Sequence, residues 1–178
     1  MVSGAKYPFN DNSFDAIWTI TVFEHIPDIQ IAMNELIRLL KPGGYLYFAP
    51  AWQCRSWAAD GYEVRKYSEF NLIGKFIKFT IPIRNSLVWR SLYIFPKRII
   101  RLILHLLNLN STNLFYKKIK ANYDIYWTTD ADACNSIDPH DVILWAYANN
   151  LECLSHQNIM KQFFVRNGVL IFKKKLKI

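Results

Sequence analysis

Two adjacent residues, Glu24 and His25, place a carboxylate and an imidazole directly after a short apolar run, Phe14–Ile20. An imidazole can take a proton from a substrate hydroxyl near neutral pH. We therefore expect His25 to act as a general base, with Glu24 beside it in the catalytic site. The alternative is structural: the two side chains would cap or orient the start of the next helix and support the wall of a pocket.

A second group of candidate residues combines aromatic rings with charged groups after the next predicted strand. Aromatic faces suit the apolar face of a sugar ring, and Asp and Arg suit its hydroxyls. We expect these residues to bind the acceptor substrate: Trp52, Trp57, Asp60, Tyr62 and Arg65. The alternative is a solvated loop with buried aromatic side chains.

Both groups follow strands of a predicted β-α-β unit. Phe14–Ile20 is typical of a strand buried on both faces of a parallel sheet, and Tyr45–Ala49 predicts a second strand. Between them, apolar residues recur at helical spacing from Ile29 to Leu40, and Lys41-Pro42-Gly43-Gly44 ends that helix. Strands joined through a helix lie parallel, so the residues after both strands meet at the edge where open α/β sheets bind ligands.

The middle of the chain differs from the rest in charge. Residues 53–122 hold 13 Lys or Arg and only three Asp or Glu, a net charge of +10 in a chain whose net charge is +8. Within it, Ile94–Leu109 predicts a helix with one narrow polar stripe, either mostly buried or lying against a membrane surface. We expect residues 53–136 to be an insertion that forms a lid over the acceptor and contacts something anionic.

The last part of the chain returns to alternating helix and strand patterns. Pro139–Asn150 predicts a helix, and Leu151–Ser155 and Gly168–Phe172 predict closing strands. The fold class expected from these patterns is α/β, in one domain.

Composition excludes several classes of protein. Hydrophobic residues make up 52% and charged residues 20%, so the chain is not expected to be disordered. We expect no signal peptide, and Ile99–Leu109 is too short and polar to span a bilayer. Three separated cysteines, Cys54, Cys134 and Cys153, predict free thiols in the cytoplasm. No metal-ligand spacing or nucleic-acid motif occurs, so we expect neither kind of partner.

Several short motifs follow one another in order within residues 7–50. They are Tyr7-Pro8-Phe9, Ser13-Phe14-Asp15, Phe23-Glu24-His25-Ile26 and Asn34-Glu35-Leu36-Ile37-Arg38-Leu39-Leu40-Lys41-Pro42-Gly43-Gly44. This series resembles the small-molecule class I S-adenosylmethionine-dependent methyltransferases, often called methyltransferase type 11. Residues 139–175 resemble the family more loosely. Residues 57–65, with 123–127 and 130–139, resemble a subgroup associated with bacterial cell-surface glycan gene clusters.

The resemblance implies a partial Rossmann-like methyltransferase sheet, the carboxyl-terminal part of the fold, in a single domain of residues 1–178 with a largely helical insertion. It implies S-adenosylmethionine as cofactor. It also implies contacts to that cofactor from Ser3, Gly4, Thr19, Thr21 and Phe23. The family's glycine-rich turn and ribose-binding acid do not occur in this sequence, so we expect an amino-terminal half to be missing.

The implied activity is methyl transfer to a small acceptor, such as a hydroxyl of a sugar or cell-surface glycan precursor. The expected partners are that small molecule and, through the basic segment, an anionic membrane surface at the inner face of the membrane. The alternative reading is a truncated, non-catalytic methyltransferase-like fragment that binds an anionic partner.

Overall fold

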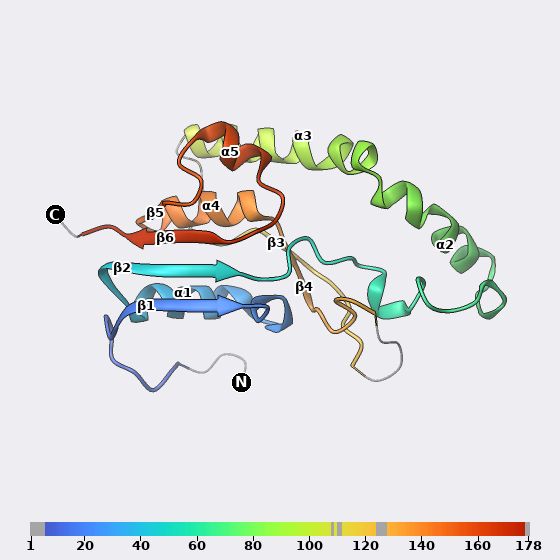
Figure 1. Ribbon diagram of the computed structural model, residues 1–178, viewed down its shortest axis with the longest axis horizontal. Coiled ribbons are helices and arrows are strands. Elements are labelled where there is room, and N and C mark those ends of the chain that lie inside the picture. The colour runs from blue at the N-terminus through green and yellow to red at the C-terminus, as the bar shows by residue number, and fades with distance from the viewer. Residues whose placement is uncertain (1–5, 108, 110–111, 124–127, 177–178) are drawn as a thin grey trace.

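The computed structural model of the chain describes residues 6–107, 109, 112–123 and 128–176. These residues form a four-stranded sheet packed against helices, with two further consecutive helices outside the sheet layer (Figure 1). The predicted α/β class is confirmed. The helices and strands are, in chain order, β1 Phe14–Ile20, α1 Ile29–Leu39, β2 Leu40–Ala49, α2 Leu72–Asn85, α3 Leu87–Leu106, β3 Tyr116–Lys118, β4 Asn135–Ile137, α4 Pro139–Ala148, β5 Leu151–Cys153, α5 Ile159–Phe164 and β6 Leu170–Lys174.

The sheet has the strand order β1-β2-β6-β5. Strands β1 and β2 are parallel, as the predicted β-α-β unit requires, and β6 runs antiparallel to both β2 and β5. The carboxyl ends of β1 and β2 therefore lie at one edge of the sheet. The short strands β3 and β4 pair with each other in a separate antiparallel ladder.

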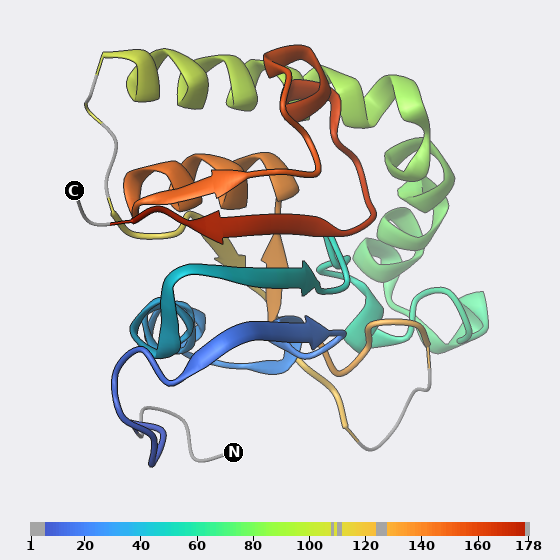
Figure 2. The same cartoon turned by 60° about the vertical axis from the view of Figure 1, so that its left-hand side comes forward.

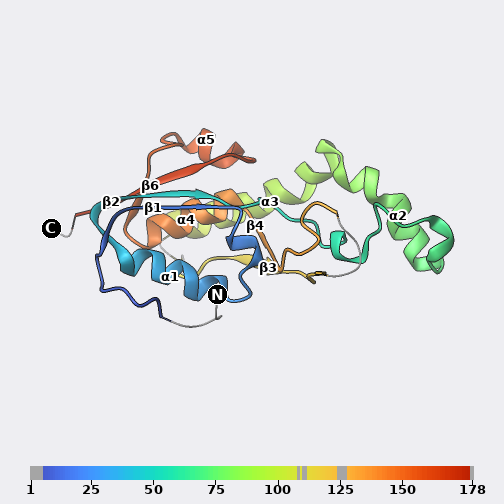
Figure 3. The ribbon, with the colours of Figure 1, turned by 60° about the horizontal axis from the view of Figure 1, so that its bottom comes forward.

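The hydrophobic core lies between the sheet and helices α1 and α4, which cover the same face (Figure 3). Helix α1 contributes one apolar stripe, whereas α4 is buried at every position from Pro139 to Ala146. A helix buried all round is expected to be apolar all round, and this explains why α4 lacks an amphipathic pattern. Strands β2 and β6 close the core with Leu46, Phe48, Leu170 and Phe172.

Strand β1 is covered on one face only, so the prediction that it is buried on both faces is wrong for the described residues. Thr19 is buried, but Trp18 is 74% exposed and Ile20 is 54% exposed. The physical reason is that α1 and α4 lie on one side of the sheet, while α5 lies on the other side beside β6 (Figure 3). Strand β1 is also an edge strand of the described sheet.

Strand β2 begins five residues earlier than predicted. Helix α1 ends at Leu39, and the chain continues directly as strand through Pro42, Gly43 and Gly44 with an irregular register opposite Phe14. Gly43 has a φ of +82°, which favours glycine. A side chain at Gly44 would come within 2.9 Å of a β1 backbone oxygen. Both glycines therefore allow the close start of the parallel pair.

Helices α2 and α3 are consecutive and are joined at Ser86. Figure 2 shows the two helices, in green, one after the other. The Asn71 side chain caps α2 by accepting from the Gly74 N–H at 2.9 Å, and the Ser86 hydroxyl caps α3. The helix predicted over Ile94–Leu109 thus begins earlier, at Leu87. It is not mostly buried, because Arg98 is its one buried residue.

Candidate functional site

The turn after β1 brings Glu24 and His25 to the predicted edge of the sheet. The Thr21 N–H donates to the Ala49 carbonyl at 2.9 Å, which extends the β1–β2 ladder past the end of β1. Thr21 has a φ of 47°, so the chain turns sharply and enters a 3-10 turn over Phe23–His25. Glu24 and His25 therefore lie just beyond the carboxyl ends of both strands.

The imidazole of His25 lies between two carboxylates. Its Nε2 is 3.5 Å from Glu24 Oε1, and its Nδ1 is 3.5 Å from Asp132 Oδ2 and 3.3 Å from the Asp132 carbonyl oxygen. The Glu24 side chain is 1% exposed and that of His25 is 34% exposed. A ligand can thus reach the imidazole while Glu24 stays buried beside it, an arrangement that suits proton transfer from a hydroxyl.

Residues near the end of the predicted insertion, 53–136, hold Glu24, His25 and Asp132 in place. The Cys134 N–H donates to the Glu24 carbonyl at 2.9 Å, and the Asn135 side-chain amide donates to the Ile26 carbonyl. Asp132 is not among the predicted site residues, because nothing in its local sequence indicates that it lies beside His25. The contact depends on a pairing between segments more than one hundred residues apart.

Two buried oxygens near the carboxyl end of β1 have no hydrogen-bond partner among the described residues: Thr19 Oγ1 and Glu24 Oε2. Buried polar atoms normally have a partner, so each can receive a hydrogen bond from a bound ligand. Phe23, in contrast, packs in the core with its ring centroid 5.0 Å from that of Phe48. The predicted cofactor contacts Ser3 and Gly4 lie outside the described residues.

A cavity of about 640 Å³ lies between the loop after β2, the joint of α2 with α3, and strands β3 and β4. Cys54 forms part of its wall. Burial, with the nearby carboxylates of Asp130 and Glu24, raises the pKa of the Cys54 thiol to about 12. Strand β4 connects the cavity to the turn that carries Glu24 and His25. Ser136 and Ile137 line the cavity, and the neighbouring Cys134 and Asn135 donate to the Glu24 and Ile26 carbonyls. Its lining residues are Gln53, Cys54, Arg55, Ser56, Trp57, Arg84, Asn85, Trp89, Arg90, Tyr93, Ile94, Lys97, Phe115, Tyr116, Lys117, Ser136, Ile137 and Asp138.

The cavity is basic and aromatic. Three of its cations, Arg84, Arg90 and Lys117, have no carboxylate partner among the described residues. The Arg84 guanidinium lies 5.9 Å from the centroid of the Trp57 ring, and Arg90 donates to the Gln53 side-chain oxygen. Such a pocket suits a ring-shaped ligand that carries a negative charge.

Of the five residues predicted to bind the acceptor, Trp57 lines the cavity. Trp52 packs against the sheet and donates from its indole to the Gly168 carbonyl at 2.7 Å. Asp60 pairs with Lys120 at 3.0 Å. The structure stacks the Tyr62 ring on Phe70 at 4.7 Å and places the Arg65 guanidinium 4.3 Å from the centre of the same ring. The acceptor role of all five stays a prediction.

Sequence reasoning missed the cavity residues of α2 and α3, notably Arg84, Trp89, Arg90 and Tyr93. The signal was present: Trp89, Tyr93 and Lys97 follow one another at a spacing of four residues, about one helical turn, with Arg90 next to Trp89. Because the whole segment is basic, this spacing could be recognised only once the bounds of α2 and α3 were known.

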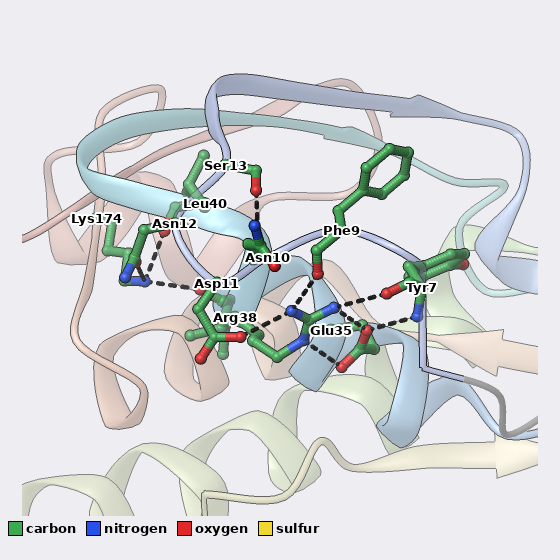
Figure 4. A network of polar contacts seen from close by, with 11 residues as sticks. Tyr7, Phe9, Asn10, Asp11, Asn12, Ser13, Glu35, Arg38, Leu40 and Lys174 are labelled. Carbon is green, nitrogen blue, oxygen red and sulfur yellow. Dashed lines mark hydrogen bonds and ion pairs between the residues drawn. The ribbon is translucent and has the colours of Figure 1, made fainter.

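The motif residues Glu35 and Arg38 fasten the segment before β1 onto helix α1 (Figure 4). Arg38 donates to both Glu35 oxygens at 2.8 and 2.7 Å, to Asp11 at 2.8 Å and to the Phe9 carbonyl at 2.8 Å. The Tyr7 N–H donates to Glu35 at 3.0 Å. The Arg38 hydrogen bond holds the pKa of the Glu35 carboxyl below its usual value. These contacts give Glu35 and Arg38 a structural role.

Comparison with known proteins places the first quarter of the chain in a family. Residues 2–48 match the model of a methyltransferase domain. The methyltransferase GfsG of Streptomyces halstedii is 48% identical over 42 residues, which cover 24% of this chain and 15% of that protein. The chloroplastic tocopherol O-methyltransferase of Arabidopsis thaliana is 36% identical over 76 residues, which cover 42% of this chain and 21% of that protein.

Among solved structures, a SAM-dependent methyltransferase of Methanosarcina mazei aligns with 96% of this chain and 63% of its own, at 15% identity and a TM-score of 0.42. The chain thus spans about a quarter or less of the length of the curated relatives it matches. The motif series of residues 7–50 and the match over residues 2–48 agree, and they identify the chain as a relative of the class I S-adenosylmethionine-dependent methyltransferases.

Proposed function

We propose that this chain is the part of an S-adenosylmethionine-dependent methyltransferase that binds the acceptor and removes its proton. One observation carries the proposal: the segment that lines a cavity of about 640 Å³ with Ser136 and Ile137 also bonds, through Cys134 and Asn135, to the turn that carries Glu24 and His25. This turn lies at the carboxyl ends of β1 and β2. These strands lie within or next to the segment that matches a methyltransferase domain, residues 2–48.

The residues present fit part of the cofactor. Thr19 Oγ1 and Glu24 Oε2 are buried acceptors without a partner among the described residues, and they would receive hydrogen bonds from polar groups of S-adenosylmethionine. When bound, that cofactor supplies an electrophilic methyl group. We propose that a further amino-terminal segment contributes the glycine-rich turn, because no G-x-G-x-G occurs in this sequence and β1 is an edge strand with an exposed apolar face.

The proposed acceptor is a small molecule with a hydroxyl on a ring, such as a sugar or glycan precursor. Trp57, Trp89 and Tyr93 would stack against the ring, and Arg84 and Lys117 would bind a phosphate or carboxylate on it. His25 would take the hydroxyl proton at its imidazole nitrogen as the oxygen is methylated. Similar proteins are named for methylation of a hydroquinone, of tocopherol and of sterols, so the test panel should include a hydroquinone, a tocopherol and a sterol.

The test is a methyl-transfer assay on the chain together with any amino-terminal segment that its gene encodes. His25→Ala should lower turnover by about 10²–10⁴-fold, because positioned proton removal contributes that much, while cofactor affinity measured by calorimetry changes little. His156→Ala, a change at another partly exposed histidine, is the matched control. Turnover of His25→Ala equal to the control would remove His25 from the mechanism. Absence of transfer to every acceptor would favour the non-catalytic alternative, a fragment that binds an anionic partner.

A further inference from the structure

Helix α3 turns its charged side toward the protein and its apolar side toward solvent, the reverse of an ordinary surface helix. Arg98 is buried and binds the Asp138 carboxylate at 2.8 Å. Lys97 and Arg101 bind the Asp141 carboxylate at 2.6 and 3.3 Å. Both acids belong to the start of α4, so the polar stripe of α3 is its protein-facing side.

The outer side of α3 is a continuous apolar stripe. Val88, Leu92, Ile99, Ile103 and Leu106 recur at spacings of three, four or seven residues, which places them on one side of the helix. Each is between 49% and 74% exposed. Single exposed apolar residues are common in proteins, but a stripe along a twenty-residue helix marks an interaction surface.

Helix α2 repeats the arrangement. Leu72, Phe76, Phe79 and Ile83 recur at helical spacing and are between 51% and 84% exposed. Its cation Lys78 points inward and donates to backbone carbonyls of the preceding loop. Two consecutive helices thus direct apolar stripes to the outside, while cations on their inner sides bind carboxylates or backbone carbonyls.

The segment that carries both stripes is basic throughout. Residues 70–123 contain ten Lys or Arg and no Asp or Glu. Among the described residues, five of these cations pair with carboxylates from outside the segment, and Lys78 binds backbone carbonyls. Three others line the cavity, so the ten cations still outnumber the four carboxylates that pair with them. Lys75 is exposed next to the α2 stripe, and Lys117 and Lys118 are exposed on β3. An anionic surface would complement this charge.

We infer that α2 and α3 lie in the surface layer of a lipid bilayer with anionic head groups, with their apolar stripes among the acyl chains. Such a bilayer provides both an apolar layer for the stripes and negative charge for the cations. A second copy of this chain would instead bring another basic segment against the first, and like charges oppose that contact. No helix in the described part of the chain is long and apolar enough to cross a membrane. The inference does not rest on the proposed methyl transfer.

The experiment is flotation of the purified chain with vesicles of phosphatidylcholine alone or mixed with phosphatidylglycerol. Wild type should float with the anionic vesicles, more weakly at high salt and with neutral vesicles. The double variant Phe79→Glu/Ile103→Glu should partition at least about tenfold less, because it places charge in both stripes. Trp18→Glu is the matched control: Trp18 is 74% exposed but lies on β1, so its replacement should leave flotation unchanged.

Circular dichroism shows whether each variant is folded. If the double variant does not fold, fluorescence quenching in the wild-type protein still tests the inference. Vesicles with brominated acyl chains should quench the fluorescence of Trp89, which is 46% exposed on α3, and the quenched component should be missing in Trp89→Phe. Failure of wild type to float with anionic vesicles would overturn the inference. So would a dimer, seen by light scattering, that the double variant converts to monomer, since a second copy would then occupy the stripes.

Discussion

Replacing Arg98 with methionine should destabilise the protein far more than the loss of an exposed ion pair. The side chains of Arg98 and Asp138 are 3% and 8% exposed. The guanidinium contacts the two Asp138 oxygens at 2.8, 3.1 and 3.4 Å and also donates to the Phe163 carbonyl at 2.5 Å. Methionine preserves much of the apolar volume but leaves the Asp138 carboxylate buried without a cation.

Removal of one partner from a buried ion pair costs about 3–5 kcal/mol, because the other charge remains away from water. Asp138 keeps hydrogen bonds from the His140 N–H and from Gln53, so we expect the lower part of this range, about 3 kcal/mol. A domain of this size has a free energy of unfolding of roughly 5–15 kcal/mol, so the loss is large.

The matched control is Lys41→Met, which breaks an ion pair of 2.8 Å whose side chains are 42% and 84% exposed and should cost less than about 1 kcal/mol. Urea unfolding followed by circular dichroism measures both variants. Arg98→Met/Asp138→Asn should recover part of the loss, since it leaves no buried charge. The reasoning is refuted if Arg98→Met is no less stable than Lys41→Met, or if the double variant is less stable than Arg98→Met by several kcal/mol.

Three further predictions concern titration and reactivity. Arg38 lowers the pKa of Glu35 below 4.5, so stabilisation by this pair is present above that pH and is lost as pH falls through the lower folded-state pKa. Arg38→Met should lower the urea midpoint at neutral pH, and the midpoint of this variant should decline less in acid than that of wild type. Burial lowers the pKa of His140 from 6.5 to about 4, so the unfolded chain binds a proton in this range that the folded chain does not. Stability should therefore decrease by up to about 3 kcal/mol from pH 6.5 to pH 4, and His140→Gln should lose this dependence in urea titrations. Burial also raises the pKa values of Cys54 and Cys134, so both thiols should react with 5,5′-dithiobis(2-nitrobenzoate) at least about tenfold more slowly in the native protein than in urea.

The β-α-β unit was predictable because its signals are local. The apolar run of β1, the helical spacing from Ile29 to Leu39 and the apolar run at the end of β2 each depend on neighbouring residues only. The exposure of Trp18 was not predictable, because it depends on which helices cover each face of the sheet. A run of apolar residues indicates a strand but not how many of its faces are covered within one chain.

The candidate site was predictable in part for the same reason. Glu24 and His25 follow β1 directly, so topology alone placed them at the sheet edge. Asp132 contacts His25 through the packing of distant segments, and the contact of Arg84 with Trp57 depends on the position of α2. The polar stripe of α3 was recognised, but its direction depends on Asp138 and Asp141, whose position follows from the fold of α4.

The shared use of Asp138 has a consequence for motion. Because this carboxylate caps α4 and binds Arg98, α3 cannot move away from the core without breaking a buried ion pair at the start of another helix. In the described part of the chain, α2 is instead held to its preceding loop by Lys78. The two helices that border the cavity are thus held by different contacts, and Ser86 joins them. Entry and exit of a ligand should therefore proceed by rotation of α2, while α3 keeps its place.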